Sequence, residues 1–166
     1  MKRAELARAL AALLDGRVVL LGVGSEWRRD DQAGAVLARK LERTHSFYPI
    51  DCGDVPEAFT GPVKEFRPDI ILIADAVDFG QKAGEIAIVD AEAVQSRRVD
   101  THHPSLRAMV DYLRAETGAK VAILGIQPGD VSMGEGMTPA VQESVGLLHA
   151  LITELLGTTS DEGATP

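Results

Sequence analysis

Acidic and imidazole side chains follow apolar segments of the sequence at three places, and together they could bind a metal ion. Asp31 follows the first apolar segment of the chain, Asp75 ends another, and His102 stands just before a proline and an amphipathic stretch. Two carboxylates and an imidazole form the mixed oxygen and nitrogen ligand set that suits a hard or borderline divalent cation. These residues predict a metal site if the fold brings them to one place.

Each candidate ligand also has a structural explanation when it is taken singly. The carboxylate of Asp75 is unfavourable at the end of an apolar strand unless it is paired, binds a cation or caps backbone N–H groups of a loop. Asp31 stands where a helix could begin, as an N-cap or as a first-turn acid favoured by the helix dipole. His102 and His103, before Pro104, could be exposed loop residues. Only their convergence at one edge of a sheet would favour the metal site.

The glycine-rich turn after the first apolar segment suggests nucleotide binding, but its pattern departs from the usual one. Gly22 and Gly24 follow a predicted strand, and the third glycine of a dinucleotide fingerprint would stand where the chain has Trp27. The acids that follow would also repel a pyrophosphate. Ser25 does not form the nucleophile elbow of a hydrolase, because Trp27 replaces the trailing glycine there too. The turn is therefore a weak indication of nucleotide binding.

The apolar pattern predicts strands that alternate with helices along the chain. Three strands are apolar on both faces, which is typical of a parallel sheet covered by helices on both sides. In such a sheet the ligand site lies beyond the carboxyl ends of the strands, where Asp31 and Asp75 stand. We expect an α/β fold with three layers, α/β/α, around a mostly parallel five-stranded sheet. The predicted strands are 17–23, 47–51, 69–75, 85–89 and 120–126, and the predicted helices 1–16, 33–41, 58–66, 106–113 and 138–156.

The length of the chain predicts one domain, over residues 1–157. The segment 158–166 lacks large apolar residues and is predicted to be a flexible tail. Pro49 places the second strand at an edge of the sheet, because proline cannot donate to a central ladder. Thr138, followed by a proline, predicts the N-cap of the last helix. The glycine-containing loop 127–137 is long enough to suggest a functional role, although its composition fits a plain crossing loop equally well.

The composition disfavours several classes of function. The 166 residues include 17 basic and 25 acidic side chains, and the net charge of −8 repels nucleic acid and anionic membranes. The single cysteine, Cys52, cannot form an intramolecular disulfide; it suits a reducing cytosol and is interpreted as a packed small residue. No apolar run approaches the roughly 20 residues that span a bilayer. The amphipathic N-terminal segment is unlike a signal peptide, so we expect a cytoplasmic protein without membrane insertion.

Six short segments share their order and spacing with one family. They are GVGSEWRRDDQAG at 22–34, PIDCGDVPE at 49–57, LIADAVDFGQKAGEI at 72–86, THHPSL at 101–106, LGIQP at 124–128 and MTPAVQESV at 137–145. Because of these segments, the chain from Val18 to Leu156 resembles the hydrogenase maturation endopeptidases, and most of all the hydrogenase 3 type.

The resemblance implies a peptidase that removes the C-terminal extension of the nickel-iron hydrogenase large-subunit precursor after nickel has been inserted. It implies that Asp31, Asp75 and His102, with His103 as a weaker candidate, bind the nickel that the precursor carries. Asp31 or Asp75 would act as general base on a water, which makes the enzyme an aspartic-type or metal-assisted endopeptidase. The substrate supplies the metal, no organic cofactor is expected, and the peptidase itself is expected to be a monomer.

Three positions depart from the family pattern. Ser25 stands where relatives usually have asparagine, Arg29 where they often have glycine, and Cys52 at the first glycine of an Asp-Gly-Gly sequence. An alternative from another class is a non-catalytic nickel or divalent-metal binding module of hydrogenase assembly that uses the same ligands. Trp27 and the loop 127–137 are candidate contacts for the large subunit, although Trp27 could equally anchor its loop on the protein's own surface.

Overall fold

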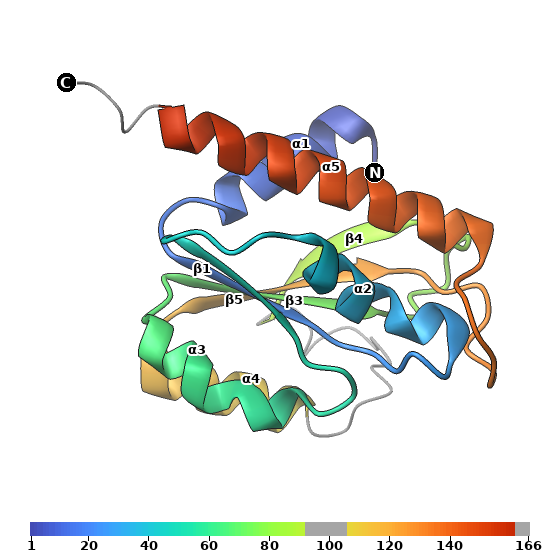
Figure 1. Ribbon diagram of the computed structural model, residues 1–166, viewed down its shortest axis with the longest axis horizontal. Helices are drawn as coiled ribbons and strands as arrows, with labels where there is room; N and C mark the ends of the chain where they lie inside the picture. The colour runs from blue at the N-terminus through green and yellow to red at the C-terminus, as the bar shows by residue number, and fades with distance from the viewer. Residues whose placement is uncertain (92–105, 162–166) are drawn as a thin grey trace.

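The computed structural model describes residues 1–91 and 106–161, in which a five-stranded sheet lies between two layers of helices (Figure 1). The strand order is β2-β1-β3-β5-β4, and every neighbouring pair is parallel except β4 and β5. This arrangement confirms the predicted α/β fold. The strands are β1 (Val18–Gly22), β2 (Phe47–Asp51), β3 (Ile70–Ala76), β4 (Ile86–Asp90) and β5 (Lys120–Ile126).

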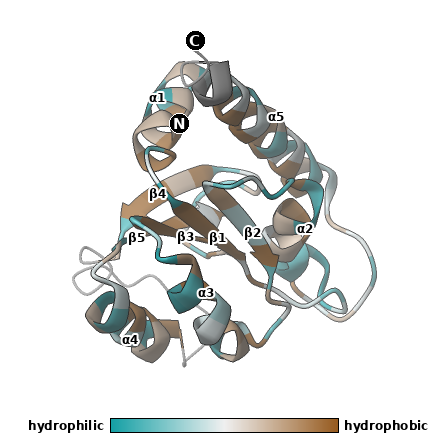
Figure 2. Cartoon of the chain, turned by 60° about the vertical axis from the view of Figure 1, so that its left-hand side comes forward, coloured by the Kyte–Doolittle hydropathy of each residue, from teal (hydrophilic) through white to brown (hydrophobic). Residues whose placement is uncertain are grey.

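The helices cover both faces of the sheet, as the apolar strands predict. Helices α1, α2 and α5 pack on one face, and α3 and α4 pack on the other (Figure 2). Two short 3-10 helices, η1 and η2, precede α2 and α3. The bounds are α1 (Arg3–Leu13), η1 (Arg29–Gln32), α2 (Ala33–Lys40), η2 (Pro56–Phe59), α3 (Thr60–Phe66), α4 (Leu106–Thr117) and α5 (Pro139–Asp161).

The alternation of side chains along the central strands divides the core into two clusters. Leu20 and Leu72 point toward α1, α2 and α5, whereas Val19 and Ile71 point toward α3 and α4. All residues of β1 and β3 are buried, because helices cover both faces. By the same alternation Asp75 lies on the α3 and α4 face of β3.

Helix α2 packs unusually close to the sheet, because two glycines meet there. A Cβ at Gly34 would clash with the carbonyl oxygen of Ala74, and a Cβ at Gly22 would clash with that of Gly34. With both side chains absent, α2 contacts β1 and β3, and η1, which directly precedes α2, contacts β3. This close approach places η1 beside the carboxyl end of β3.

Strand β2 lies at an edge, where Pro49 pairs only with Leu20. Helix α5 begins after Thr138 and continues to Asp161, past the end of its apolar pattern. Cys52 is buried, and burial together with the charge of Asp51 raises the pKa of its thiol to about 12. No helix among residues 1–91 and 106–161 has the length and apolarity that a bilayer span requires.

Candidate active site

The candidate site lies where the direction of the sheet's connections reverses. From β1 the chain continues to β2 on one side, and then crosses to β3 on the other side of β1. Gly22, the last residue of β1, is in register with Ala74, and the amide of Val23 donates to the Ala74 carbonyl at 2.9 Å. Ligands of open α/β sheets bind at such a switch point, beyond the carboxyl ends of the strands. Asp75 stands at this point on β3.

Asp75 is a buried acid for which the described residues provide no hydrogen-bond partner. Its exposed fraction is 0%, and neither carboxyl oxygen has a hydrogen-bond partner among the described residues. In the described part of the chain, no backbone N–H group of a loop donates a hydrogen bond to Asp75, so these residues do not support the alternative that Asp75 caps a loop. A buried polar group without partners is rare in folded proteins and calls for an explanation, such as an ion that is absent from the protein alone.

Burial and a neighbouring charge make ionisation of Asp75 unfavourable. Desolvation is the main cause that raises the pKa of Asp75 well above its usual range, and the negative charge of Asp31 raises it further. The backbone amide of Ala76 acts in the opposite direction, but its effect is the smallest of the three. A cation between the two carboxylates would reverse this balance, because it would favour the charged form of both.

Asp31 lies in η1, and its carboxylate is oriented by the glycine-rich turn. Its Oδ2 accepts a hydrogen bond from the amide of Ser25 at 2.9 Å, and the side chain is buried. Gly24, at φ +142°, allows this approach, since a Cβ there would clash with the Asp31 carbonyl oxygen. The glycine turn thus positions an acid. The departure at Ser25 leaves this hydrogen bond intact, because the donor is the backbone.

The two predicted histidine ligands lie outside the described residues. His102 and His103 fall within 92–105, so the structure tests neither of them. In the part of the chain that is described, no group of three or more His, Cys, Asp or Glu side chains has the arrangement of a metal site. The structure therefore places two of the predicted ligands, Asp31 and Asp75, close enough for one charge to raise the pKa of the other.

Sequence reasoning missed the neighbouring acid, Asp30. Its side chain is completely buried and accepts hydrogen bonds from Gly129, Asp130 and Thr138. A possible signal was the long glycine-containing loop, whose backbone N–H groups need acceptors if they are buried. Thr138, predicted as an N-cap, directs its hydroxyl to Asp30.

A groove of about 390 Å³ lies next to the candidate site. Ser25, which holds Asp31, is part of its wall, and Asp51 at the carboxyl end of β2 is another part. The apolar members of the wall include Trp27, Val55 and Phe59. The groove therefore offers both apolar and polar surface beside the acids.

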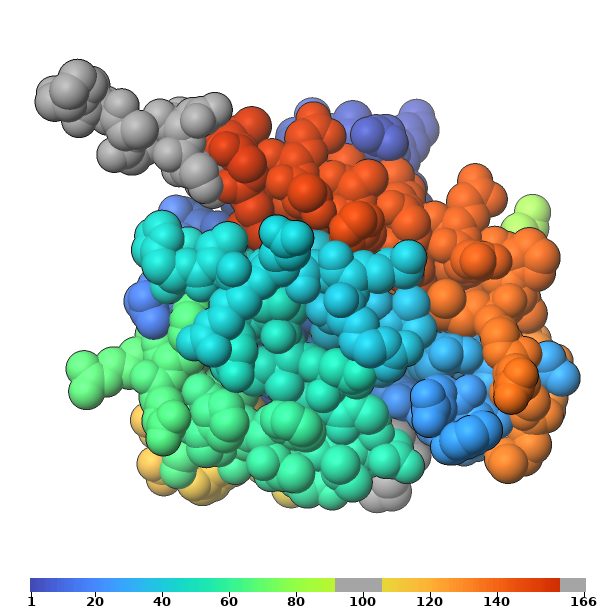
Figure 3. Space-filling model, in the orientation of Figure 1, coloured from blue at the N-terminus to red at the C-terminus, as the bar shows by residue number. Residues whose placement is uncertain are grey.

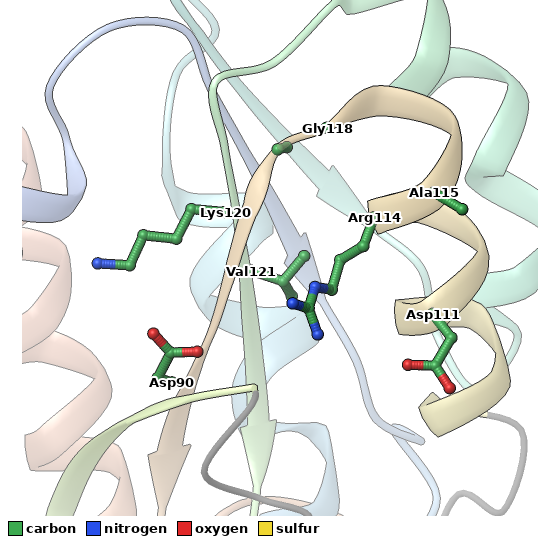
Figure 4. Close-up of a pocket in the computed structure, with 8 residues that line it drawn as sticks. Asp90, Asp111, Arg114, Ala115, Gly118, Lys120 and Val121 are labelled. Carbon is green, nitrogen blue, oxygen red and sulfur yellow. The ribbon is translucent and has the colours of Figure 1, made fainter.

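A larger cavity, of about 550 Å³, lies at the amino end of β5, away from the candidate site (Figure 4). Lys120 at the amino end of β5 and Arg114 on α4 face it, together with Asp90 and Asp111. Bases and acids are interspersed, so the cavity favours no ligand of one charge. It is also remote from the carboxyl ends of β1 and β3, and we do not assign the reaction to it.

The departure at Arg29 has a measurable consequence for stability. Arg29 has φ +47°, a left-handed conformation that glycine adopts without strain. Its guanidinium donates to the Glu135 carbonyl at 3.2 Å and pairs with Asp130 at 3.7 Å. Arg29→Ala and Arg29→Gly both lose these contacts, but only the glycine relieves the backbone.

We therefore expect Arg29→Gly to exceed Arg29→Ala in unfolding free energy by about 1 kcal/mol. Urea unfolding of the two variants at pH 7 measures this difference, with the wild type as reference. An alanine variant at least as stable as the glycine variant would contradict the strain at this position.

Comparisons with known proteins agree with this fold. The family profile described as hydrogenase maturation protease matches residues 35–155. The hydrogenase 3 maturation protease of Escherichia coli K12 is 36% identical over 134 residues, which are 79% of this chain and 85% of that protein. A crystal structure of a hydrogenase 3 maturation protease has a TM-score of 0.69 at 34% identity and covers 82% of this chain and 88% of its own.

A second crystal structure agrees more closely in shape. It is a NiFe hydrogenase maturation protease from Thermococcus kodakarensis, with a TM-score of 0.82 and 31% identity. The similarity covers 90% of this chain and 99% of that chain, so the two share most of the fold described above. The chain therefore belongs to the hydrogenase maturation protease family.

Proposed function

We propose that this protease is an endopeptidase that removes the C-terminal extension of the nickel-iron hydrogenase large-subunit precursor, and that it acts once nickel has been inserted. The observation that carries the proposal is the buried carboxyl group of Asp75, which has no hydrogen-bond partner among residues 1–91 and 106–161 and lies at the switch point of the sheet, where the charge of Asp31 acts on it. Such a pair is unfavourable in the free protein and becomes favourable when a cation arrives.

The nickel of the precursor is the substrate group that this pair would recognise. Asp31 and Asp75 would supply carboxylate oxygens and His102 an imidazole, a donor set that suits nickel. His102 shortly precedes α4, which packs on the same face of the sheet as Asp75. This position in the sequence supports His102 as the third ligand.

Peptide-bond cleavage then requires a base and a positioned water. Among the described residues, Asp31 accepts a hydrogen bond only at its Oδ2 and Asp75 accepts none, so each acid has an oxygen that can take a proton from water. Docking of the nickel would fix the scissile bond next to these acids, so that position selects the bond. Because the binding energy is available only after nickel insertion, the enzyme would act as a checkpoint on assembly. We further propose that it works in the cytoplasm as a monomer.

Incubation with two forms of one purified precursor tests the proposal. We expect the nickel-loaded form to lose its C-terminal extension, seen by intact-mass spectrometry, and the nickel-free form to remain whole. Binding of the loaded precursor without cleavage would instead support the non-catalytic metal-binding module. Cleavage of both forms at the same rate would contradict nickel recognition.

Trp27 is expected to contact the large subunit. It is 59% exposed beside the groove, and its carbonyl accepts the amide of Gly134, next to Met133, which is 75% exposed. Exposed tryptophans often dominate protein interfaces, and loss of one typically weakens binding by about 2 kcal/mol, roughly 30-fold. Trp27→Ala should therefore raise KM for the loaded precursor with little change in kcat.

Steady-state cleavage assays measure both constants for this variant. The matched control is Tyr112→Ala, because Tyr112 is an exposed aromatic residue on α4, away from the groove. Equal KM values for Trp27→Ala and the wild type would show that Trp27 only anchors its own loop.

A further inference from the structure

Asp30 is the most completely hydrogen-bonded acid near the candidate site. Its Oδ2 accepts the amides of Gly129 at 2.8 Å and Asp130 at 3.0 Å, and also the hydroxyl of Thr138 at 2.8 Å. Its Oδ1 accepts the amide of Thr138 at 2.6 Å. The side chain is fully buried. These four bonds engage both oxygens of the carboxylate, so the loop already uses most of the acceptor capacity of Asp30.

The four bonds attach both ends of the segment 127–138, which is the loop 127–137 together with Thr138, to η1. Gly129 and Asp130 belong to the start of the loop, and Thr138 is its last residue before α5. Backbone bonds reinforce the attachment: the amide of Asp30 donates to Asp130 at 3.0 Å, and that of Arg29 donates to Gly134 at 3.3 Å. Figure 3 shows the two segments side by side, in blue and orange at the right of the molecule.

The three acids differ systematically in hydrogen bonding. Asp30 accepts four hydrogen bonds, Asp31 one and Asp75 none among the described residues. Asp30 and Asp31 share a peptide bond, so whatever fixes Asp30 also fixes the direction from which Asp31 leaves the backbone. An acid with many hydrogen bonds next to an acid with few is the arrangement in which one residue supports the orientation of a reactive neighbour.

We propose that Asp30 is a positioning residue, which holds Asp31 toward Asp75 by tying η1 to the loop 127–138. This inference rests on the proposed function for its effect on cleavage. Its structural consequence is independent of that function, because the orientation of Asp31 is reported by the hydrogen bond from the Ser25 amide. A purely stabilising role at the start of α5 would leave that hydrogen bond unchanged.

The decisive variant is Asp30→Asn, which keeps the shape but directs an NH2 group at backbone or hydroxyl donors. We expect hydrogen exchange of the Ser25 amide, followed by NMR, to become at least about 10-fold faster. We also expect kcat on the nickel-loaded precursor to fall by about 10–100-fold, with KM nearly constant.

Ser144→Ala serves as the matched control for stability. Ser144 is buried in α5 and donates to the carbonyl of Gly84, so its loss weakens the packing of the same helix without touching η1. It should leave both Ser25 exchange and kcat near wild-type values. The same changes in Ser144→Ala as in Asp30→Asn would assign them to stability and overturn the proposal.

Thr138→Val provides a milder test if Asp30→Asn does not fold. It removes one of the four donors and keeps the backbone amide, so we expect a several-fold increase in Ser25 exchange. Unchanged Ser25 exchange in either folded variant overturns the positioning role. Absence of cleavage by the wild type would instead contradict the proposed function, and the exchange measurement would still decide on Asp30.

Discussion

Asp75→Asn is expected to make the free protein more stable at neutral pH and to abolish cleavage of the nickel-loaded precursor. The carboxyl group of Asp75 is buried, has no hydrogen-bond partner in the described part of the chain, and is affected by the charge of Asp31. An asparagine has nearly the same shape and no charge, so it avoids the unfavourable ionisation. It also lacks the negatively charged carboxylate that would bind the cation. The variant should therefore gain stability and lose activity.

The gain in stability should depend on pH with a definite sign. Because the pKa of Asp75 is raised in the folded protein, the folded state holds the proton more tightly than the unfolded chain. The favourable contribution of this proton is complete below about pH 4, the ordinary pKa of aspartate, and is lost as the pH rises through the folded pKa. The advantage of asparagine over aspartate should therefore grow by about 1.4 kcal/mol per pH unit across that interval.

Thermal unfolding of both proteins between pH 4 and pH 8 measures this dependence. Each kcal/mol of difference corresponds to about 2–4 °C in Tm for a domain of this size. Asp15→Asn, at an exposed position beyond α1, removes a charge without burial and should show no such trend. An Asp75→Asn variant that is equally or less stable at pH 7 would mean that Asp75 is stabilised by contacts that the described residues do not include.

Asp75 illustrates how far sequence alone leads toward the site. The apolar run before it predicts a central strand, and a central parallel strand places its last residues at the edge where ligands bind. The order of the strands, and hence the switch point between β1 and β3, is not contained in that pattern. It depends on which helices cover which face, and thus on contacts such as that of Gly34 with Ala74.

The pair Asp30 and Asp31 shows what the sequence could not resolve. Two consecutive acids differ by one position, yet one accepts four hydrogen bonds from the loop 127–138 and the charge of the other raises the pKa of Asp75. The difference arises from backbone geometry, including the left-handed φ of Arg29, and from a loop about a hundred positions away. Neither hydrophobic periodicity nor helix signals carry such information, so both acids look alike as candidates for the start of a helix.

Asp31→Asn and His102→Ala are expected to reduce kcat/KM for the nickel-loaded precursor by about 10²–10⁴-fold, the usual contribution of a general base or an essential ligand. Asparagine at 31 can still accept the Ser25 amide, so its loss of activity would reflect charge rather than orientation. His102→Ala removes the imidazole from the proposed nickel ligands. The two variants thus separate the two kinds of donor.

Single-turnover cleavage of loaded precursor, followed by mass spectrometry, measures both losses. The matched controls are Glu42→Gln and His45→Ala, which change an exposed acid and an exposed histidine on the side of the sheet remote from the carboxyl ends of β1 and β3. If Asp31→Asn cleaves at the wild-type rate, the reaction does not use the carboxylate at the switch point. If only His102→Ala is fully active, the third nickel ligand must be sought elsewhere, with His103 the first alternative.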